Sequence, residues 1–119
     1  MTDQSPVFAL IAGEASGDQL GAALIEQLRE GFPGAQFAGI GGHRMRQAGM
    51  ECWWDAGELA VMGLFEVLSH LPRLLRLRRE LYRRLLELRP AVTIGIDAPD
   101  FNLGLEAKLR GQGLRTVHY

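Results

Sequence analysis

Two carboxylates and an amide follow directly on an apolar, β-branched run, in the stretch Ala91-Val-Thr-Ile-Gly-Ile-Asp-Ala-Pro-Asp-Phe-Asn102. A buried parallel strand is a nearly continuous hydrophobic run. Residues 92–96 fit this description, and Gly95 leaves room for a group to approach the backbone closely. Ligands of open α/β sheets bind in the crevice beyond the carboxyl ends of the strands. Asp97 is therefore placed where a general base would be useful, although a loop carboxylate can equally do no more than hydrogen-bond backbone amides.

The same turn carries two further polar side chains. Asp97 and Asp100 are three positions apart around Pro99, so one can cap the helix expected from about Phe101 while the other faces the crevice. We predict that Asp100 is the cap. Asn102 could orient a substrate hydroxyl, or stand in the first helical turn without a role.

A second loop that could face a ligand, Gly13-Glu-Ala-Ser-Gly-Asp18, follows the first expected strand and opens a helix. Its backbone N–H groups and the positive end of the helix dipole could hold a phosphate or a sugar hydroxyl. It lacks the ending of a P-loop and the dinucleotide pattern G-x-G-x-x-G, and Glu14 and Asp18 would repel a phosphate. Two interpretations of Ser16 and Asp18 stay open: caps of the following helix, or parts of a ligand-facing loop.

Gly39-Ile-Gly-Gly-His-Arg44 resembles a dinucleotide fingerprint only superficially, because it follows the second expected strand and has Arg in place of the last Gly. The sequence therefore does not support a nicotinamide or flavin site. Gly41 and Gly42 favour a tight turn over close approach of a ligand. His43 and Arg44 are cation donors without an identified target.

The elements that must position these side chains alternate between strands and helices. Strands are expected at 6–12, 36–40, 50–54, 92–96 and from 113 onward, and helices at 19–30, 43–48, 66–88 and 101–110. The long helix is expected to break or kink near Pro72, and segment 59–63 is ambiguous. This alternation predicts an α/β fold, a Rossmann-like parallel sheet with flanking helices and right-handed crossovers.

Length and composition fit one globular domain: 119 residues, 47% hydrophobic and 23% charged. No apolar stretch approaches the roughly 20 residues that cross a bilayer, and the amino terminus lacks the pattern of a signal peptide, so a cytoplasmic location is expected. The single Cys52 is expected to be a packed core thiol, and the ligand spacings of a metal site are missing. Because a strand begins at 113 and the sequence stops inside it, we expect the first part of a longer protein or a truncated chain.

Charge is strongly segregated along the chain. The segment 71–89 carries seven arginines and two glutamates, a net +5, which leaves −6 for the rest of the chain's net −1. Such a basic amphipathic helix, with apolar residues just before it, is typical of a membrane-surface element. An ordinary crossover helix that packs its leucines on the sheet and solvates its arginines is the open alternative. Nucleic acid is disfavoured, because the chain is net acidic and lacks interleaved exposed aromatics.

These segments together resemble the amino-terminal part of the lipid-A-disaccharide synthases, bacterial glycosyltransferases of the lipid A pathway. The resemblance spans essentially the whole chain, and its motifs are specific in combination. They are Ala12-Gly-Glu-Ala-Ser-Gly-Asp18, Gly39-Ile-Gly-Gly-His-Arg-Met45, Glu58-Leu-Ala-Val-Met-Gly63 with Glu66-Val-Leu68, Gly95-Ile-Asp-Ala-Pro-Asp-Phe-Asn102 and Thr116-Val-His-Tyr119.

The resemblance implies a GT-B fold, in which two Rossmann-like domains face a cleft. Residues 1–119 would form part of the N-terminal, acceptor-side domain, without the domain that grips UDP, and the fragment alone would be inactive. The implied reaction joins UDP-2,3-diacylglucosamine to 2,3-diacylglucosamine 1-phosphate, with inversion, to give the β-1,6 disaccharide 1-phosphate and UDP. No cofactor and no metal are implied. A non-enzymatic Rossmann-like module that binds a nucleotide or another ligand is the alternative function.

The resemblance also assigns roles to residues. It makes Asp97 the catalytic base, and Glu14, Ser16, Asp18, Asp100 and Asn102 candidate substrate contacts. The implied partners are the two acylated sugars and an anionic membrane surface, with the enzyme peripheral on the cytoplasmic side of the inner membrane of a Gram-negative bacterium. The sequence leaves the oligomeric state open. The candidate membrane-facing patch consists of Val61, Met62, Leu64, Phe65, Leu68, Leu71, Leu75, Arg73 and Arg76.

Overall fold

The computed structural model describes residues 5–64 and 71–119, except for the side chains of residues 61–64 and 71. Its centre is a five-stranded sheet of parallel pairs in the order β3-β2-β1-β4-β5. The predicted α/β, Rossmann-like fold class is confirmed. The strands are β1 (Val7–Ala12), β2 (Gln36–Gly41), β3 (Glu51–Asp55), β4 (Val92–Ile96) and β5 (Thr116–His118).

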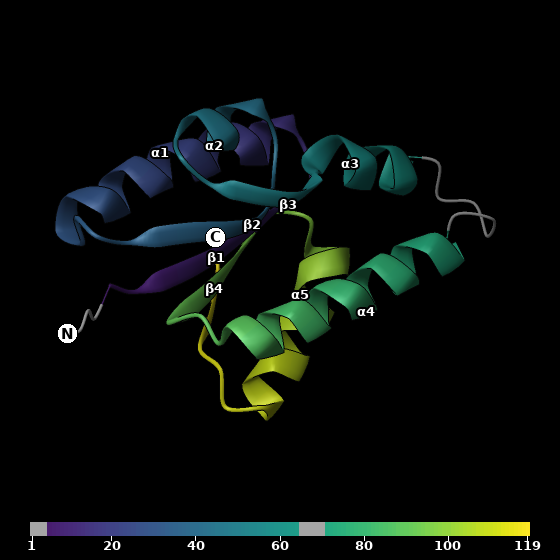
Figure 1. Ribbon diagram of the computed structural model, residues 1–119. Helices are drawn as coiled ribbons and strands as arrows, with labels where there is room; N and C mark the ends of the chain where they lie inside the picture. The colour runs from purple at the N-terminus through teal and green to yellow at the C-terminus, as the bar shows by residue number, and fades with distance from the viewer. Residues whose placement is uncertain (1–4, 65–70) are drawn as a thin grey trace.

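The helices cover both faces of this sheet, and Figure 1 shows α1 and α2 on one side with α4 and α5 on the other. The chain first builds outward from β1 to β3, then returns to place β4 on the other side of β1. Strand order therefore reverses between β1 and β4, which is where open α/β sheets hold ligands. The helices are α1 (Ala15–Gly31), α2 (His43–Gln47), α3 (Ala56–Leu64), α4 (Leu71–Leu88) and α5 (Pro99–Gly111).

Burial on both faces follows from the alternation of side chains along the central strand. Ala9 and Ile11 of β1 belong to a core shared with α3, α4 and α5. Phe8, Leu10 and Ala12 belong to a second core shared with α1 and α2. Because both faces are covered, apolar residues run continuously along β1 instead of alternating with polar ones.

Some of the predicted boundaries can be compared with the structure. Of the predicted helix 66–88, the structure describes Leu71–Leu88 as α4, with Pro72 near its described start. Residues 66–70, which bear on the predicted break near Pro72, lie outside the described residues. The ambiguous segment 59–63 is part of α3. The last strand begins at Thr116, not at 113, because the preceding residues close α5.

That closure has the hydrogen-bond pattern of a Schellman motif. Gly113 has a φ of 83°, its N–H donates to the carbonyl of Arg110 at 3.0 Å, and the N–H of Leu114 donates to the carbonyl of Leu109 at 3.1 Å. Glycine adopts this left-handed conformation without a steric penalty.

Gly39 is the position where the sheet depends most on a missing side chain. It pairs with Leu10 of β1, its φ is 147°, and a Cβ there would collide with the carbonyl oxygen of Leu10. We expect Gly39→Ala to lower the free energy of unfolding by more than the roughly 1–3 kcal/mol of backbone strain alone. Gly31→Ala is the control, because a Cβ at Gly31 meets nothing within 4 Å. Thermal unfolding that is equally unaffected in both variants would contradict this interpretation of the sheet.

Candidate active site

Asp97 lies immediately after β4, in a turn whose backbone is left-handed at two successive residues. Asp97 has a φ of 50° and Ala98 a φ of 43°. Aspartate tolerates this region better than most residues and alanine does not, and such residues cost of order 1–3 kcal/mol each. The surrounding hydrogen bonds must therefore hold the turn. The N–H groups of Phe101 and Asn102 donate to the carbonyl of Ala98 at 3.1 and 2.9 Å.

Asn102 acts on this turn from a fully buried position in α5. Its side-chain Nδ2 donates to the carbonyl of Asp97 at 3.0 Å and to the carbonyl of Ile11 in β1 at 3.2 Å. The amide thus ties the end of the central strand to the turn after β4. Its Oδ1 has no partner among the described residues. Asn102 therefore fixes the backbone of the turn and is not itself exposed to a ligand.

Asp18 is also buried, and its carboxylate caps a helix that does not contain it. The backbone N–H groups of Gly42, Arg44 and Met45 donate to its two oxygens at 2.8, 3.0 and 3.0 Å. Asp18 therefore satisfies the free N–H groups at the start of α2. The interpretation of Ser16 and Asp18 as side-chain caps of α1 is wrong, because Glu14 stands at the N-cap of α1 and makes no side-chain capping bond.

The loop before α1 and the turn after β4 meet at the same edge of the sheet. A Cβ on Gly13 would lie 3.0 Å from the Cβ of Ala98 and 3.9 Å from Cδ1 of Leu59 in α3. Glu14 at the N-cap and Ser16 in the first turn of α1 follow as exposed side chains, and the Ser16 hydroxyl donates to Oε1 of Glu14 at 3.1 Å. The structure therefore brings two of the candidate contacts to the edge where Asp97 lies.

Asp100 does not cap α5 as predicted. The helix begins at Pro99, its N-cap is Ala98, and no side chain caps it. Because the helix starts two residues earlier than predicted, Asp100 stands inside the first turn, where a negative charge is favourable next to the positive end of the helix dipole. Its side chain is exposed at the carboxyl edge of the sheet.

The candidate membrane-facing patch is only partly described. Phe65, Leu68 and the side chains of Val61, Met62, Leu64 and Leu71 lie outside the described part of the chain. The remaining three members, Arg73, Leu75 and Arg76, are exposed at the start of α4, and Leu75 is 46% exposed.

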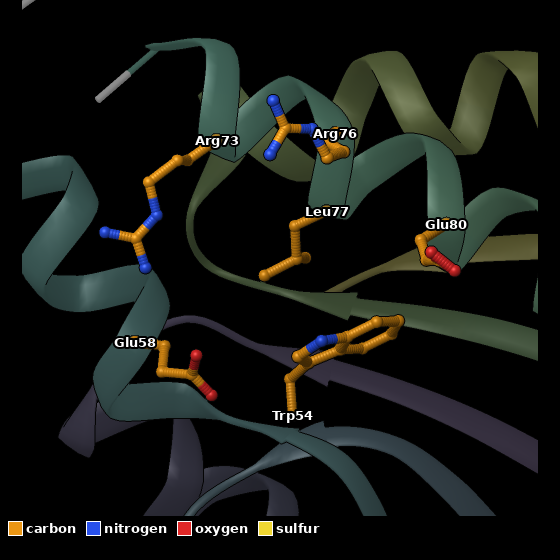
Figure 2. Close-up of a pocket in the computed structure, with 6 residues that line it drawn as sticks. All are labelled: Trp54, Glu58, Arg73, Arg76, Leu77 and Glu80. Carbon is orange, nitrogen blue, oxygen red and sulfur yellow. The ribbon is translucent and has the colours of Figure 1, made fainter. Parts of the chain in front are cut away.

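Beside these residues, α3, α4 and the end of β3 enclose a pocket of about 230 Å³. In Figure 2 the Arg73 side chain reaches across it toward Glu58, and Leu77 points at the Trp54 ring. Cations and carboxylates line it in equal number, so the pocket is not a simple anion site. Its walls are Trp54, Glu58, Arg73, Arg76, Leu77 and Glu80.

The contact by which β3 holds the basic helix was not predicted from the sequence. The Arg84 guanidinium lies 4.1 Å from the ring centroid of Trp53 and 5.9 Å from that of Trp54. A cation over an indole face is attracted by the ring quadrupole. Adjacent tryptophans ahead of an arginine-rich helix were a signal for this contact. One arginine of α4 is thus used to attach the helix and is not simply solvated.

A polar cluster beneath α5 was also not predicted from the sequence. Glu106 is 2% exposed, and one of its carboxylate oxygens lies 2.9 Å from Nδ1 of His118 in β5. Asn102 and Glu106 are four residues apart and so lie on one face of the helix. That spacing, opposite a strand that contains Thr93 and Gly95, was the available signal.

The side chains of Asp55 and Cys52 in β3 have shifted pKa values. The Arg46 guanidinium, 2.8 Å from Asp55, lowers the pKa of that exposed carboxyl. Burial raises the pKa of the Cys52 thiol, and Cys52 packs half-buried against the second core, as predicted. Its thiol is therefore protonated at neutral pH and a poor nucleophile.

Across residues 5–64 and 71–119, no helix combines the length and apolar character needed to span a bilayer. In the same part of the chain, no group of three His, Cys, Asp or Glu side chains could hold a metal ion.

Comparison with known proteins identifies relatives along almost the whole chain. The family model described as lipid-A-disaccharide synthetase matches residues 8–119. The lipid-A-disaccharide synthase of Xylella fastidiosa strain M12 is 63% identical over 116 residues, which are 98% of this chain and 30% of that protein. That of Xanthomonas oryzae strain MAFF 311018 is 64% identical over 114 residues, 96% of this chain and 26% of that protein. The chain thus spans 26% to 30% of the length of these relatives.

The cap of α2 is directly testable. Asp18→Ala leaves three backbone N–H groups without their acceptor, and leaving even one buried donor unsatisfied costs about 1–3 kcal/mol. We expect a marked fall in the thermal unfolding midpoint, and a smaller fall for Asp18→Asn, which keeps one acceptor oxygen. Ser16→Ala, at an exposed position, should leave the midpoint unchanged. Equal midpoints for Asp18→Ala and Ser16→Ala would refute the capping role.

Proposed function

The chain belongs to the lipid-A-disaccharide synthetase family, and on this premise we propose that the full-length protein is an inverting glycosyltransferase of lipid A biosynthesis. Its donor is UDP-2,3-diacylglucosamine and its acceptor 2,3-diacylglucosamine 1-phosphate. The products are the β-1,6-linked disaccharide 1-phosphate and UDP. The observation that carries the proposal is the position of Asp97, at the carboxyl edge of the sheet beside the point where strand order reverses.

In this mechanism Asp97 is the general base. The 6-hydroxyl of the acceptor attacks the anomeric carbon of the donor while Asp97 takes the hydroxyl proton. The bond from the anomeric carbon to the UDP oxygen breaks on the opposite face, and its electron pair leaves with UDP. A hydroxyl is a weak nucleophile, and a positioned carboxylate contributes typically about 10²- to 10⁴-fold to such a step.

The candidate substrate contacts divide by burial. Glu14, Ser16 and Asp100 are exposed and can reach a sugar directly. Asp18 and Asn102 are buried and bound to backbone groups, so we propose that they act on the acceptor by shaping the two loops that face it.

In a GT-B fold, acceptor and donor bind to different domains. Residues 1–119 supply part of the N-terminal, acceptor-side domain, and a second Rossmann-like domain supplies the UDP site. The chain spans only 26% to 30% of the length of its relatives, which is consistent with this division. The chain alone would therefore not catalyse the transfer.

We propose that basic residues of α4 bind the enzyme to the membrane surface that holds its acylated substrates. Arg73, Leu75 and Arg76 are all exposed near the start of α4. Arg73 and Arg76 are three residues apart and so are neighbours on the helix surface. Helices that lie in the interface of an anionic membrane carry exposed cationic and apolar side chains. We place the enzyme peripherally, on the cytoplasmic face of the inner membrane of a Gram-negative bacterium.

The catalytic assignment is tested by Asp97→Asn in the full-length enzyme. Asparagine also tolerates a positive φ, so this variant keeps the turn while alanine would add strain. We expect acceptor-dependent UDP release to fall by about 10²- to 10⁴-fold, with an unchanged thermal unfolding midpoint. Undiminished release would remove Asp97 from the role of base, and absence of release in the unmodified enzyme would contradict the reaction itself.

The membrane assignment is tested by vesicle binding. Each of Arg73→Ala and Arg76→Ala should cost about 1 kcal/mol, roughly a five-fold loss of binding to anionic vesicles. Arg44→Ala is the matched control, because Arg44 is exposed on α2, on the other side of the sheet. The differences in vesicle binding between the two α4 variants and the unmodified enzyme should decrease at high salt. Equal binding by all three variants would contradict the assignment.

A further inference from the structure

The buried carboxylate of Glu106 lies in the layer between α5 and the sheet. Transfer of a carboxylate into a protein interior is costly unless it is paired and hydrogen-bonded. Glu106 is 2% exposed, and the core on this face of the sheet includes the buried Leu105, Leu109 and Leu114. A carboxylate at this position needs a physical explanation that packing alone does not provide.

The adjacent strand is shaped to receive it. Side chains alternate along β4: Ile94 and Ile96 pack into the core beneath α1, so Thr93 and Gly95 face α5. A Cβ on Gly95 would collide with Oε2 of Glu106 and would lie 3.0 Å from Cβ and Cγ of Asn102. The glycine therefore provides the space in which both polar side chains of α5 reach the sheet.

The partner of Glu106 comes from the edge strand. His118 pairs with Gly95 in the register of β4 and β5, and its Nδ1 lies 2.9 Å from Oε2 of Glu106. A carboxylate only accepts hydrogen bonds, so the imidazole donates from Nδ1. In this way Glu106 fixes the imidazole at one end of β5.

The same end of β5 holds the backbone of Asp97. The N–H of Tyr119 donates to the carbonyl of Gly95 at 2.7 Å, and the N–H of Asp97 donates to the carbonyl of Tyr119 at 3.0 Å. On its other side, the carbonyl of Asp97 accepts the Asn102 amide at 3.0 Å. Both the N–H and the carbonyl of Asp97 are therefore hydrogen-bonded. The N–H is bonded to the residue that follows β5, and the carbonyl to a side chain of α5.

We propose that Glu106 and His118 are positioning residues for Asp97. Their hydrogen bond keeps residues 118–119 in place beside β4. The Tyr119 carbonyl can then accept the Asp97 N–H and so help to hold Asp97 in its left-handed conformation. The inference rests on the proposed function for its effect on turnover. Its structural part, the coupling of the pair to the Asp97 N–H, does not depend on that function.

The experiment uses the full-length enzyme with two substitutions at His118. His118→Phe keeps a ring but removes the donor, whereas His118→Asn offers an N–H close to the position of Nδ1. We expect His118→Phe to lower kcat by about 10- to 100-fold, the scale of a misplaced catalytic group, with KM for both substrates within about two-fold of the original. His118→Asn should restore most of kcat. Arg115→Ala, an exposed side chain just before β5, is the control and should leave kcat unchanged.

Hydrogen exchange of the Asp97 amide gives a readout that needs no activity. Its protection against exchange should fall about ten-fold or more in His118→Phe, because the turn then opens locally more often. Protection should recover in His118→Asn. If His118→Phe does not fold, Glu106→Gln provides the same comparison, because it keeps the shape and an acceptor oxygen but removes the charge; we expect intermediate losses of kcat and protection.

The outcomes separate the two proposals. Unchanged protection and unchanged kcat in both His118→Phe and Glu106→Gln overturn the positioning role. Equal falls in kcat for His118→Phe and His118→Asn indicate a structural loss and also overturn it. If protection falls as expected but Asp97→Asn retains full activity, the coupling stands and the assignment of Asp97 as the base fails.

Discussion

The left-handed turn at Asp97 and Ala98 is the constraint on which the arrangement of the carboxyl edge depends. Two successive non-glycine residues with positive φ persist only where the surroundings over-determine them. Here the surroundings are drawn from three parts of the chain: the amide of Asn102 in α5, the carbonyl of Tyr119 after β5, and the loop at Gly13 that packs against Ala98. Residues far apart in sequence thus share the work of directing one carboxylate.

The two buried acidic side chains of the described chain illustrate different ways to keep a carboxylate inside a protein. Asp18 accepts only backbone N–H groups, and so joins the start of α2 to α1. Glu106 instead takes a side chain as its partner and joins α5 to β5. Asp18 connects two helices that are separated by β2, whereas Glu106 connects α5 to the strand that directly follows it. Each carboxylate thereby fixes the relative position of two elements at the sheet edge.

Much of this organisation was predictable from local pattern. The apolar run 92–96 identified β4, and the polar residues that follow it placed Asp97 correctly at the strand end. Capping was not predictable, because Asp18 receives its hydrogen bonds from residues 42–45, across an intervening strand. Asp100 was assigned as a cap because Pro99 was expected to precede the helix. In the structure, Pro99 is instead the first residue of α5. Glu106 was not singled out in the sequence, because its partner is set by the pairing of β5 with β4 and not by local pattern.

The stack of Arg84 on the adjacent tryptophans has a consequence for how α4 is attached to the sheet. A hydrogen bond fails within a few tenths of an ångström, but attraction between a cation and an aromatic face extends to about 6 Å from the ring centroid. Arg84 lies within that range of both Trp53 and Trp54. Each of the two adjacent rings of β3 therefore contributes to holding the same guanidinium. The attachment of the basic helix to β3 is less sensitive to small changes in geometry than a single hydrogen bond would be.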